Sequence, residues 1–285
     1  MKRVCIRWES LTLVLAASIL FASPARGRSK HRPSAAQASA VAASTRRTPV
    51  VVELFTSEGC SDCPPADVLL RQLEATQPIP GVEVIPIEEH VDYWNHDGWV
   101  DPFSSAQWTS RQQDYVAKLK ASTEYTPQMV VDGESQLVGS FAAAAERSIE
   151  IAALGPHVEV AIAPGRPDGK DAADFSVTVG KLPGAAQGKT EEVWLAVTED
   201  GLHSSVSAGE NAGHELYHAA VLRSLTRIGD ANAAAASDSF TGDPRVKFGS
   251  HWNRANLRVA VFVQEKQTKH ILGAAETNAS PASRD

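Results

Sequence analysis

Between Pro49 and Leu154, apolar and polar residues are arranged in blocks that predict strands and helices in turn. The runs 50–55 and 82–87 are almost continuously apolar, which is typical of strands buried on both faces of a sheet. Apolar residues recur at helical spacing after Pro64-Pro65 and again over 105–121, which predicts two helices. The two prolines support the start of the first helix, because proline suits the first helical turn. This part of the chain therefore predicts alternating strands and helices.

The next segments complete this pattern and then change it. Asp132-Gly133 lies between two short apolar runs, which predicts a hairpin, and an alanine-rich helix is expected over 141–154. The expected order is β-α-β-α-β-β-α. After Gly155-Pro156, short alternating runs separated by glycine and proline occupy residues 157–163, 175–179, 193–198, 215–225 and 256–264. Such runs indicate an antiparallel sandwich or barrel.

These patterns predict two folded domains. We expect an α/β domain over residues 49–154, a β-rich, sandwich-like domain over 155–276, and a tail at 277–285. The length of 285 residues provides enough apolar material for a buried core in each.

The N-terminus has the pattern of an export signal. Basic residues precede an apolar stretch over 11–22, and small residues follow, which predicts a signal peptide over 1–25 and a periplasmic or secreted protein. Residues 26–48 contain six Lys or Arg and no acid, which predicts a disordered linker. No apolar run is long enough for a transmembrane segment.

Charge narrows the range of partners. The formal net charge of the chain is -7, but the basic N-terminus masks a more acidic remainder. Residues 49–285 contain 18 basic and 33 acidic residues, a net charge of -15. A surface this acidic argues against nucleic acid as a partner. The oligomeric state is left open by the sequence.

The most informative motif is Cys60-Ser-Asp-Cys63, between the first predicted strand and the first predicted helix. A helix N-terminus favours the thiolate at Cys60, and Cys63 lies one turn further on, where it can resolve a mixed disulfide. A structural disulfide remains open, as does a metal site that combines both sulfurs with a histidine, because thiolates suit Cu(I). Thiol–disulfide exchange requires no cofactor, and we assign neither a cofactor nor metal ligands.

A strand, a C-x-x-C helix, a further strand and helix, and then Thr126-Pro127 before a hairpin are together similar to the thioredoxin fold. The resemblance implies that Pro127 is cis and faces the cysteines, with Thr126 preceding it. It also implies a buried acid that relays protons, for which Glu53 is the candidate. The expected fold class is therefore a thioredoxin-like α/β domain followed by a β-rich, sandwich-like domain.

Longer strings resemble a bacterial exported family catalogued as domain of unknown function 1223. The resemblance covers about residues 50–275 and is strongest in Glu53-Leu-Phe-Thr-Ser-Glu-Gly-Cys60, Cys63-Pro-Pro-Ala-Asp67, His90-Val-Asp-Tyr-Trp94, Gly98-Trp99, Asp101-Pro-Phe103, Tyr125-Thr-Pro-Gln-Met129 and Gly209-Glu-Asn211. The family implies a thioredoxin-like domain in an exported protein, and no defined activity.

The function expected from these patterns is thiol–disulfide exchange on protein or small thiol partners, which would make the chain a thiol–disulfide oxidoreductase. Cys60 would attack, Cys63 would resolve, and Pro127 would shape the edge that binds the partner. One alternative is a non-catalytic binding protein with a structural disulfide. Another is a copper-handling thioredoxin-like domain that uses both sulfurs and His90 or His96.

Overall fold

The computed structural model describes residues 47–280, except 168, 170 and 184–189. The predicted signal peptide and the predicted linker up to residue 46 lie outside the described residues, as does the end of the predicted tail, 281–285. Within the described part, no helix combines the length and the apolar character that a membrane span requires.

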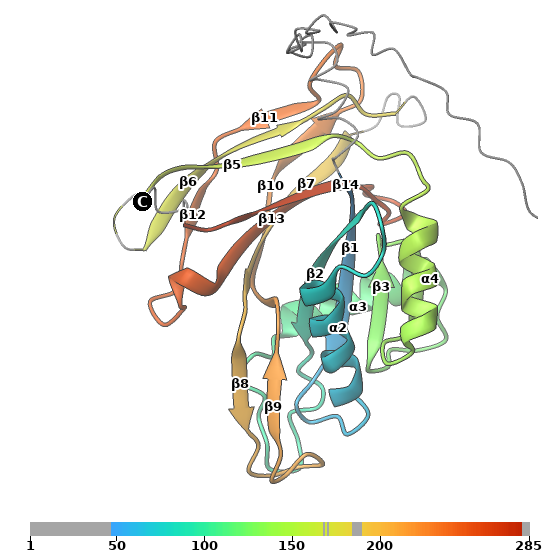
Figure 1. The fold of residues 1–285 in the computed structure, drawn as a ribbon, viewed down its shortest axis with the longest axis vertical. Helices are drawn as coiled ribbons and strands as arrows, with labels where there is room; N and C mark the ends of the chain where they lie inside the picture. Colours follow the sequence, from blue (N-terminus) through green and yellow to red (C-terminus); the bar gives the residue numbers. More distant parts are fainter. Residues whose placement is uncertain (1–46, 168, 170, 184–189, 281–285) are drawn as a thin grey trace, which may run out of the picture. The chain divides into compact units, whose positions relative to one another are not determined.

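The strands and helices of the N-terminal part, residues 47–154, follow the predicted order (Figure 1). They are β1 (Thr48–Thr56), α2 (Pro64–Thr76), β2 (Val82–His90), α3 (Ala106–Leu119), β3 (Gln128–Val131), β4 (Ser135–Val138) and α4 (Ala142–Ala152). The hairpin turn is the predicted one, since Asp132 and Gly133 both have positive φ. Periodicity was sufficient for most of these elements because all but β4 bury at least part of one face.

In the C-terminal part, residues 155–280, the described residues form strands and one short 3-10 helix. These elements are β5 (Val160–Pro167), β6 (Ala172–Val179), β7 (Thr190–Glu199), β8 (Leu202–Ser205), β9 (Glu215–His218), β10 (Val221–Asn232), β11 (Phe240–Gly242), β12 (Arg245–Lys247), η2 (Arg254–Asn256), β13 (Leu257–Gln264) and β14 (Ile271–Asn278). The run 215–225, predicted as one segment, is two strands, because Ala220 has a left-handed φ of 51° that breaks the extended chain.

The predicted fold class, a thioredoxin-like α/β domain followed by a separate β-rich domain, is wrong. A mixed eight-stranded sheet runs through both parts in the order β14-β13-β7-β10-β2-β1-β3-β4. The two parts meet where β10 pairs in parallel with β2, at Val221 and Glu88. The hydrophobic pattern correctly predicted most of the strands but gave no information about which strand pairs with β2.

A shared core explains why the two parts do not separate. One hydrophobic cluster combines side chains from both sides of the junction, and Phe262 of β13, fully buried, lies within it. Its members are Val51, Ile85, Ile87 and Trp108 from the N-terminal part, and Ala196, Leu222, Ala260, Phe262, Ile271 and Ala274 from the C-terminal part. Separating the parts would expose this apolar surface to water.

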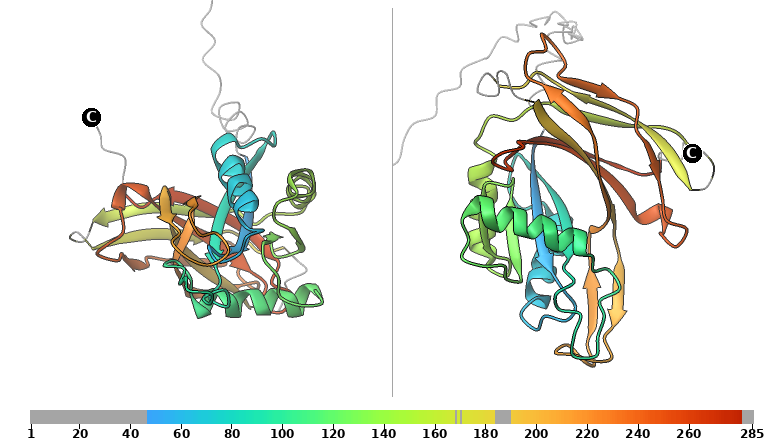
Figure 2. Two further views of the ribbon diagram at one scale, coloured as in Figure 1. Left: turned by 90° about the horizontal axis from the view of Figure 1, so that it is seen from below. Right: turned by 180° about the vertical axis from the view of Figure 1, so that it is seen from behind.

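The C-terminal part also has the layered packing expected of a sandwich, although one layer belongs to the shared sheet. A second sheet contains β5, β6, β11 and β12, with β6 paired to all three others. Side chains of this sheet pack against β7 and β13 in a second buried cluster. The hairpin β8–β9 leaves the layers between β7 and β10 and lies beside α2 (Figures 1 and 2).

We predict that Phe262→Ala destabilises the whole described fold in one step. Removing a buried phenylalanine typically costs about 3–5 kcal/mol, and this side chain packs on both parts of the chain. Urea unfolding followed by circular dichroism and by tryptophan fluorescence should therefore shift to lower urea as a single, coincident transition.

The matched control is Phe141→Ala, at a side chain that is 61% exposed. It should change the free energy of unfolding by less than about 0.5 kcal/mol. Two separate transitions in the Phe262 variant, only one of them shifted, would contradict the shared core.

Candidate functional site

Cys60 and Cys63 form a disulfide at the junction between β1 and α2. Their exposed fractions are 1% and 0%, so the bond is covered on all sides. Helix α2 begins directly after it: the carbonyl of Cys63 accepts the N–H groups of Ala66 and Asp67. Pro64 and Pro65 fill the first two helical positions, where a missing N–H is tolerated.

A tryptophan links the disulfide turn to the segment before β3. The carbonyl oxygen of Trp94 lies 2.8 Å from the position that a Cβ would occupy at Gly59, so only glycine permits this close approach. The indole N–H of Trp94 donates to the hydroxyl of Thr126, at 2.8 Å. The Thr126-Pro127 peptide is cis. Trp94 thus bridges the turn that carries Cys60 and the cis peptide that the resemblance implied.

The cover on the other side comes from the C-terminal part, through the loop between β8 and β9. The side-chain amide of Asn211 donates to the carbonyl oxygens of Glu58 and Cys60, at 2.8 and 2.9 Å. The neighbouring carboxylate of Glu210 accepts the N–H of Ser61, at 3.0 Å. A thiolate needs direct access to a sulfur atom, so the buried disulfide can react only after part of its cover has moved.

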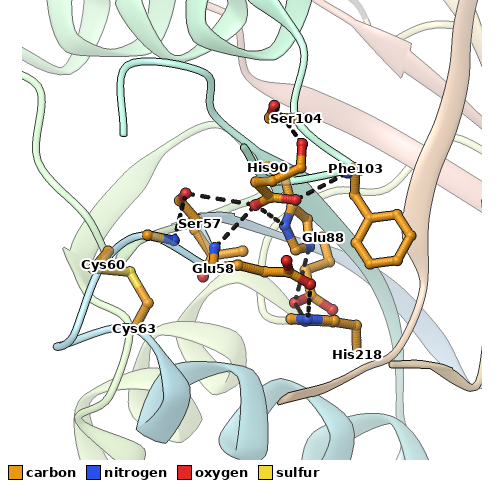
Figure 3. A network of polar contacts seen from close by, with 12 residues as sticks. Ser57, Glu58, Cys60, Cys63, Glu88, His90, Phe103, Ser104 and His218 are labelled. Carbon is orange, nitrogen blue, oxygen red and sulfur yellow. Dashed lines mark hydrogen bonds and ion pairs between the residues drawn. A yellow bond between two sulfur atoms is a disulfide. The ribbon is translucent and has the colours of Figure 1, made fainter. Parts of the chain in front are cut away.

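A buried polar cluster lies beside the disulfide, at the carboxyl ends of β1 and β2 (Figure 3). In parallel sheets this edge is where strands present side chains for binding or catalysis. The cluster is drawn from four segments far apart in the sequence. Its members are Glu58 after β1, Glu88 and His90 at the end of β2, Asp101 in the following loop, and His218 at the end of β9.

Each histidine of this cluster contacts one carboxylate in common and one of its own. The ring nitrogens of His90 lie 2.7 Å from Asp101 Oδ2 and 3.4 Å from Glu88 Oε1. Those of His218 lie 2.8 Å from the same Glu88 Oε1 and 3.2 Å from Glu58 Oε1. The other oxygen of Glu88 accepts a backbone N–H, that of Ala219. Positive and negative groups therefore alternate through the cluster.

This alternation decides the charge states, because burial alone would make each group neutral. Burial raises the pKa of Glu88, but the two histidines outweigh it and lower that pKa to about 2. For His218, burial lowers the pKa, yet Glu88 and Glu58 raise it to about 9. His90 likewise has a pKa well above its usual range, because Asp101 and Glu88 outweigh burial. Glu88, His90 and His218 are thus each favoured in the charged form near neutral pH.

A further buried acid lies on the first turns of α2. Asp67 accepts a hydrogen bond from the hydroxyl of Thr56, at 2.7 Å. Burial and the charge of Glu88 raise the pKa of Asp67 to about 7. The backbone N–H of Asp67 donates a hydrogen bond to the carbonyl of Cys63, so Asp67 lies one helical turn from the disulfide.

Glu53, the predicted proton relay, lies on the face of β1 that is turned away from α2. Its carboxylate accepts hydrogen bonds from Arg111, at 2.6 Å, and from the hydroxyl of Tyr115. Strand alternation explains the separation: Glu53 faces α3, whereas Leu54 packs with Ala66 on the side of α2. Through Trp94 the structure connects the turn before Cys60 with Thr126, and it places Glu53 in a different set of contacts.

Sequence reasoning missed several residues of this site. Asn211 lies 151 positions from Cys60, whose carbonyl accepts its amide, and Glu210 lies 149 positions from Ser61, whose N–H it accepts. His218 belongs to none of the sequence motifs, and the structure shows it as a buried residue at the end of strand β9. The alternation of residues along β9 is the sequence signal that could have indicated an inward-facing His218. Leu216 and His218 are two positions apart and fall on the buried face of the strand.

A protein family and several solved structures are similar to this chain. The sequence model of the family described as "Protein of unknown function (DUF1223)" matches residues 51–264. No curated protein matches significantly. A crystal structure of a structural-genomics target from Agrobacterium tumefaciens is similar at a TM-score of 0.62 and 22% identity, covering 84% of this chain and 98% of that one. HBP35 of Porphyromonas gingivalis is similar at a TM-score of 0.60 and 18% identity, covering 84% and 78%. At these identities the likeness concerns the fold alone.

We predict that Asn211→Ala exposes the disulfide to reductant. The change removes two donors to buried carbonyl groups, each worth about 1 kcal/mol net, and so lowers the free energy of opening the loop. The rate of reduction by a water-soluble phosphine should rise about tenfold or more, since about 1.4 kcal/mol corresponds to a factor of ten.

Asn253→Ala is the matched control, because Asn253 caps η2 and has no contact with the cysteines. Its disulfide should be reduced at the wild-type rate. An unchanged rate in the Asn211 variant, with the fold intact, would show that this loop does not limit access.

Proposed function

This chain belongs to the DUF1223 family, whose function is unknown, and we propose from the geometry of the chain that it is an exported thiol–disulfide exchange protein. Cys60 and Cys63 would react with protein or small thiol partners. The observation that carries the proposal is the Cys60–Cys63 disulfide itself, formed at the start of α2 and adjoining, through Trp94, the cis Thr126-Pro127 peptide. The signal-peptide pattern supports a setting in which disulfides persist.

Stability alone is a weak reason for this bond. The two cysteines are three positions apart, and the chain-entropy relation gives about 2 kcal/mol for so short a loop, less than for longer loops. The surrounding core already fixes the turn, through hydrogen bonds from Asn211 and the contact between Gly59 and Trp94. A reactive role accounts better for a bond that adds little to a segment already held in place.

The proposed reaction transfers two electrons without any further cofactor. In the reduced protein, the thiolate of Cys60 attacks one sulfur of a partner disulfide, and the other partner sulfur leaves as a thiolate. Cys63, deprotonated, then attacks the Cys60 sulfur, which restores the Cys60–Cys63 bond and releases the second partner thiolate. The protein is oxidised by two electrons and the partner disulfide is reduced; the reverse sequence oxidises a partner dithiol.

The contacts favour Cys60 as the residue that forms the mixed disulfide. Cys63 is fully buried at the helix start, where its carbonyl belongs to the first helical turn. Cys60 precedes the exposed residues Ser61 and Asp62. Withdrawal of Asn211 and Glu210 would uncover this side of the turn and leave α2 unchanged.

The complete burial of both sulfurs favours a second candidate, a non-catalytic binding protein in which the disulfide is structural. In that case the loop 209–211 would be a permanent cover. The two candidates differ in whether a folded protein exchanges disulfides.

We predict that reduced Cys63→Ser forms a stable mixed disulfide through Cys60 when it is mixed with oxidised glutathione, because no resolving thiol remains. Intact-mass spectrometry under native conditions should show the glutathione adduct. Cys60→Ser is the matched control and should form at least about tenfold less adduct in the same time, because Cys63 is held at the start of α2, whereas Cys60 adjoins the exposed Ser61.

Equal labelling of both variants only after unfolding in urea would support the structural disulfide instead. Circular dichroism of each variant, recorded before mixing, establishes that the comparison is made on folded protein.

A further inference from the structure

Three side chains in the buried cluster place atoms that could bind a metal ion close to one another. Glu88, His90 and His218 each offer an atom within 4.8 Å of the others, and the three residues are 0%, 0% and 2% exposed. Glu88 and His90 are two positions apart on β2, so they project from the same face of the strand. His218 reaches them from β9.

The orientation of both imidazole rings matches that of metal ligands. In such sites one ring nitrogen faces the metal and the other donates to a carboxylate or carbonyl, which fixes the ring. His90 turns Nε2 toward Glu88 Oε1 and Nδ1 toward Asp101. His218 turns Nδ1 toward the same Glu88 oxygen and Nε2 toward Glu58. The arrangement of a ligand nitrogen backed by a carboxylate therefore occurs twice around one oxygen.

One atom of the set is buried without a hydrogen-bond partner. His90 Nε2 has none, although its ring is fully buried and faces Glu88 Oε1 at 3.4 Å. Two ligands of a tetrahedral zinc ion, each at about 2.0–2.1 Å from it, lie about 3.4 Å apart. The separation is thus too long for a strong hydrogen bond and suits a shared ion.

We propose that Glu88, His90 and His218 bind a divalent transition metal ion of the Zn²⁺ class, with Asp101 and Glu58 as outer partners. Two imidazole nitrogens and one carboxylate oxygen form a donor set that such ions accept, and it leaves coordination positions for water or a small ligand. No sulfur belongs to the set. The site is therefore separate from the dithiol and does not depend on the proposed exchange reaction.

A surface cavity adjoins the site. This cavity of about 480 Å³ is lined by His218 and Ala219 together with Arg71, Asp200 and Tyr217. Once bound, an ion would tie β9 to β2 and so add a link across the junction between the two parts of the chain.

The test uses the purified full-length chain, stripped with chelator and titrated with Zn²⁺ and, as a spectroscopic probe, Co²⁺. We expect one equivalent of metal and a Co²⁺ spectrum of nitrogen and oxygen ligands without a sulfur charge-transfer band. The double variant Cys60→Ser, Cys63→Ser should bind with unchanged stoichiometry.

Glu88→Gln tests the shared ligand while it keeps an acceptor for the N–H of Ala219. Its affinity should fall at least about 100-fold, at or beyond the upper end of the 10- to 100-fold typical of losing an outer partner. His214→Gln, at an exposed histidine beside the same hairpin, is the matched control and should bind like wild type.

Three outcomes would overturn the proposal: no stoichiometric binding by the wild-type chain, a sulfur charge-transfer band in its Co²⁺ spectrum, or equal affinity in the Glu88 and His214 variants. If Glu88→Gln does not fold, the wild-type stoichiometry and spectrum decide the question without it.

Discussion

The buried carboxylate of Glu88 is the group on which the site depends. Its oxygens contact both cluster histidines and the backbone N–H of Ala219. The backbone N–H of Glu88 donates to the carbonyl of Ala220. A carboxylate without these partners would be costly to bury. Glu88 therefore binds β2 to the start of β10, at the same place where β10 joins the sheet.

This junction also explains how a disulfide in one part of the chain is covered by a loop from the other. Because β10 pairs with β2, the β8–β9 hairpin that precedes it lies beside α2 and brings Asn211 over the turn of Cys60. Glu58 connects the two features: its carboxylate contacts His218 in the cluster, and its carbonyl accepts the amide of Asn211. A movement of the loop at Asn211 and a rearrangement of the buried polar cluster therefore both act on the same residue, Glu58.

The sequence predicted those features whose signal is local. The strands 50–55 and 82–87, the helix after Pro64, the Asp132-Gly133 turn and the position of the C-x-x-C motif follow from periodicity and turn chemistry. The separate second domain was wrong, since strand pairing between β2 and β10 is a long-range choice that hydrophobic periodicity does not encode. For the same reason the contacts of Asn211 and His218 with residues more than 120 positions away could not be predicted.

The reduction potential of the Cys60–Cys63 pair, measured by equilibration with glutathione in the folded protein, tests the central claim most directly. A covered but reactive disulfide should be a reversible couple between about -120 and -270 mV, the range of exchange proteins. A couple below about -300 mV, where structural disulfides lie, would contradict the account. The function would then lie in the fold around the disulfide instead of in the bond itself.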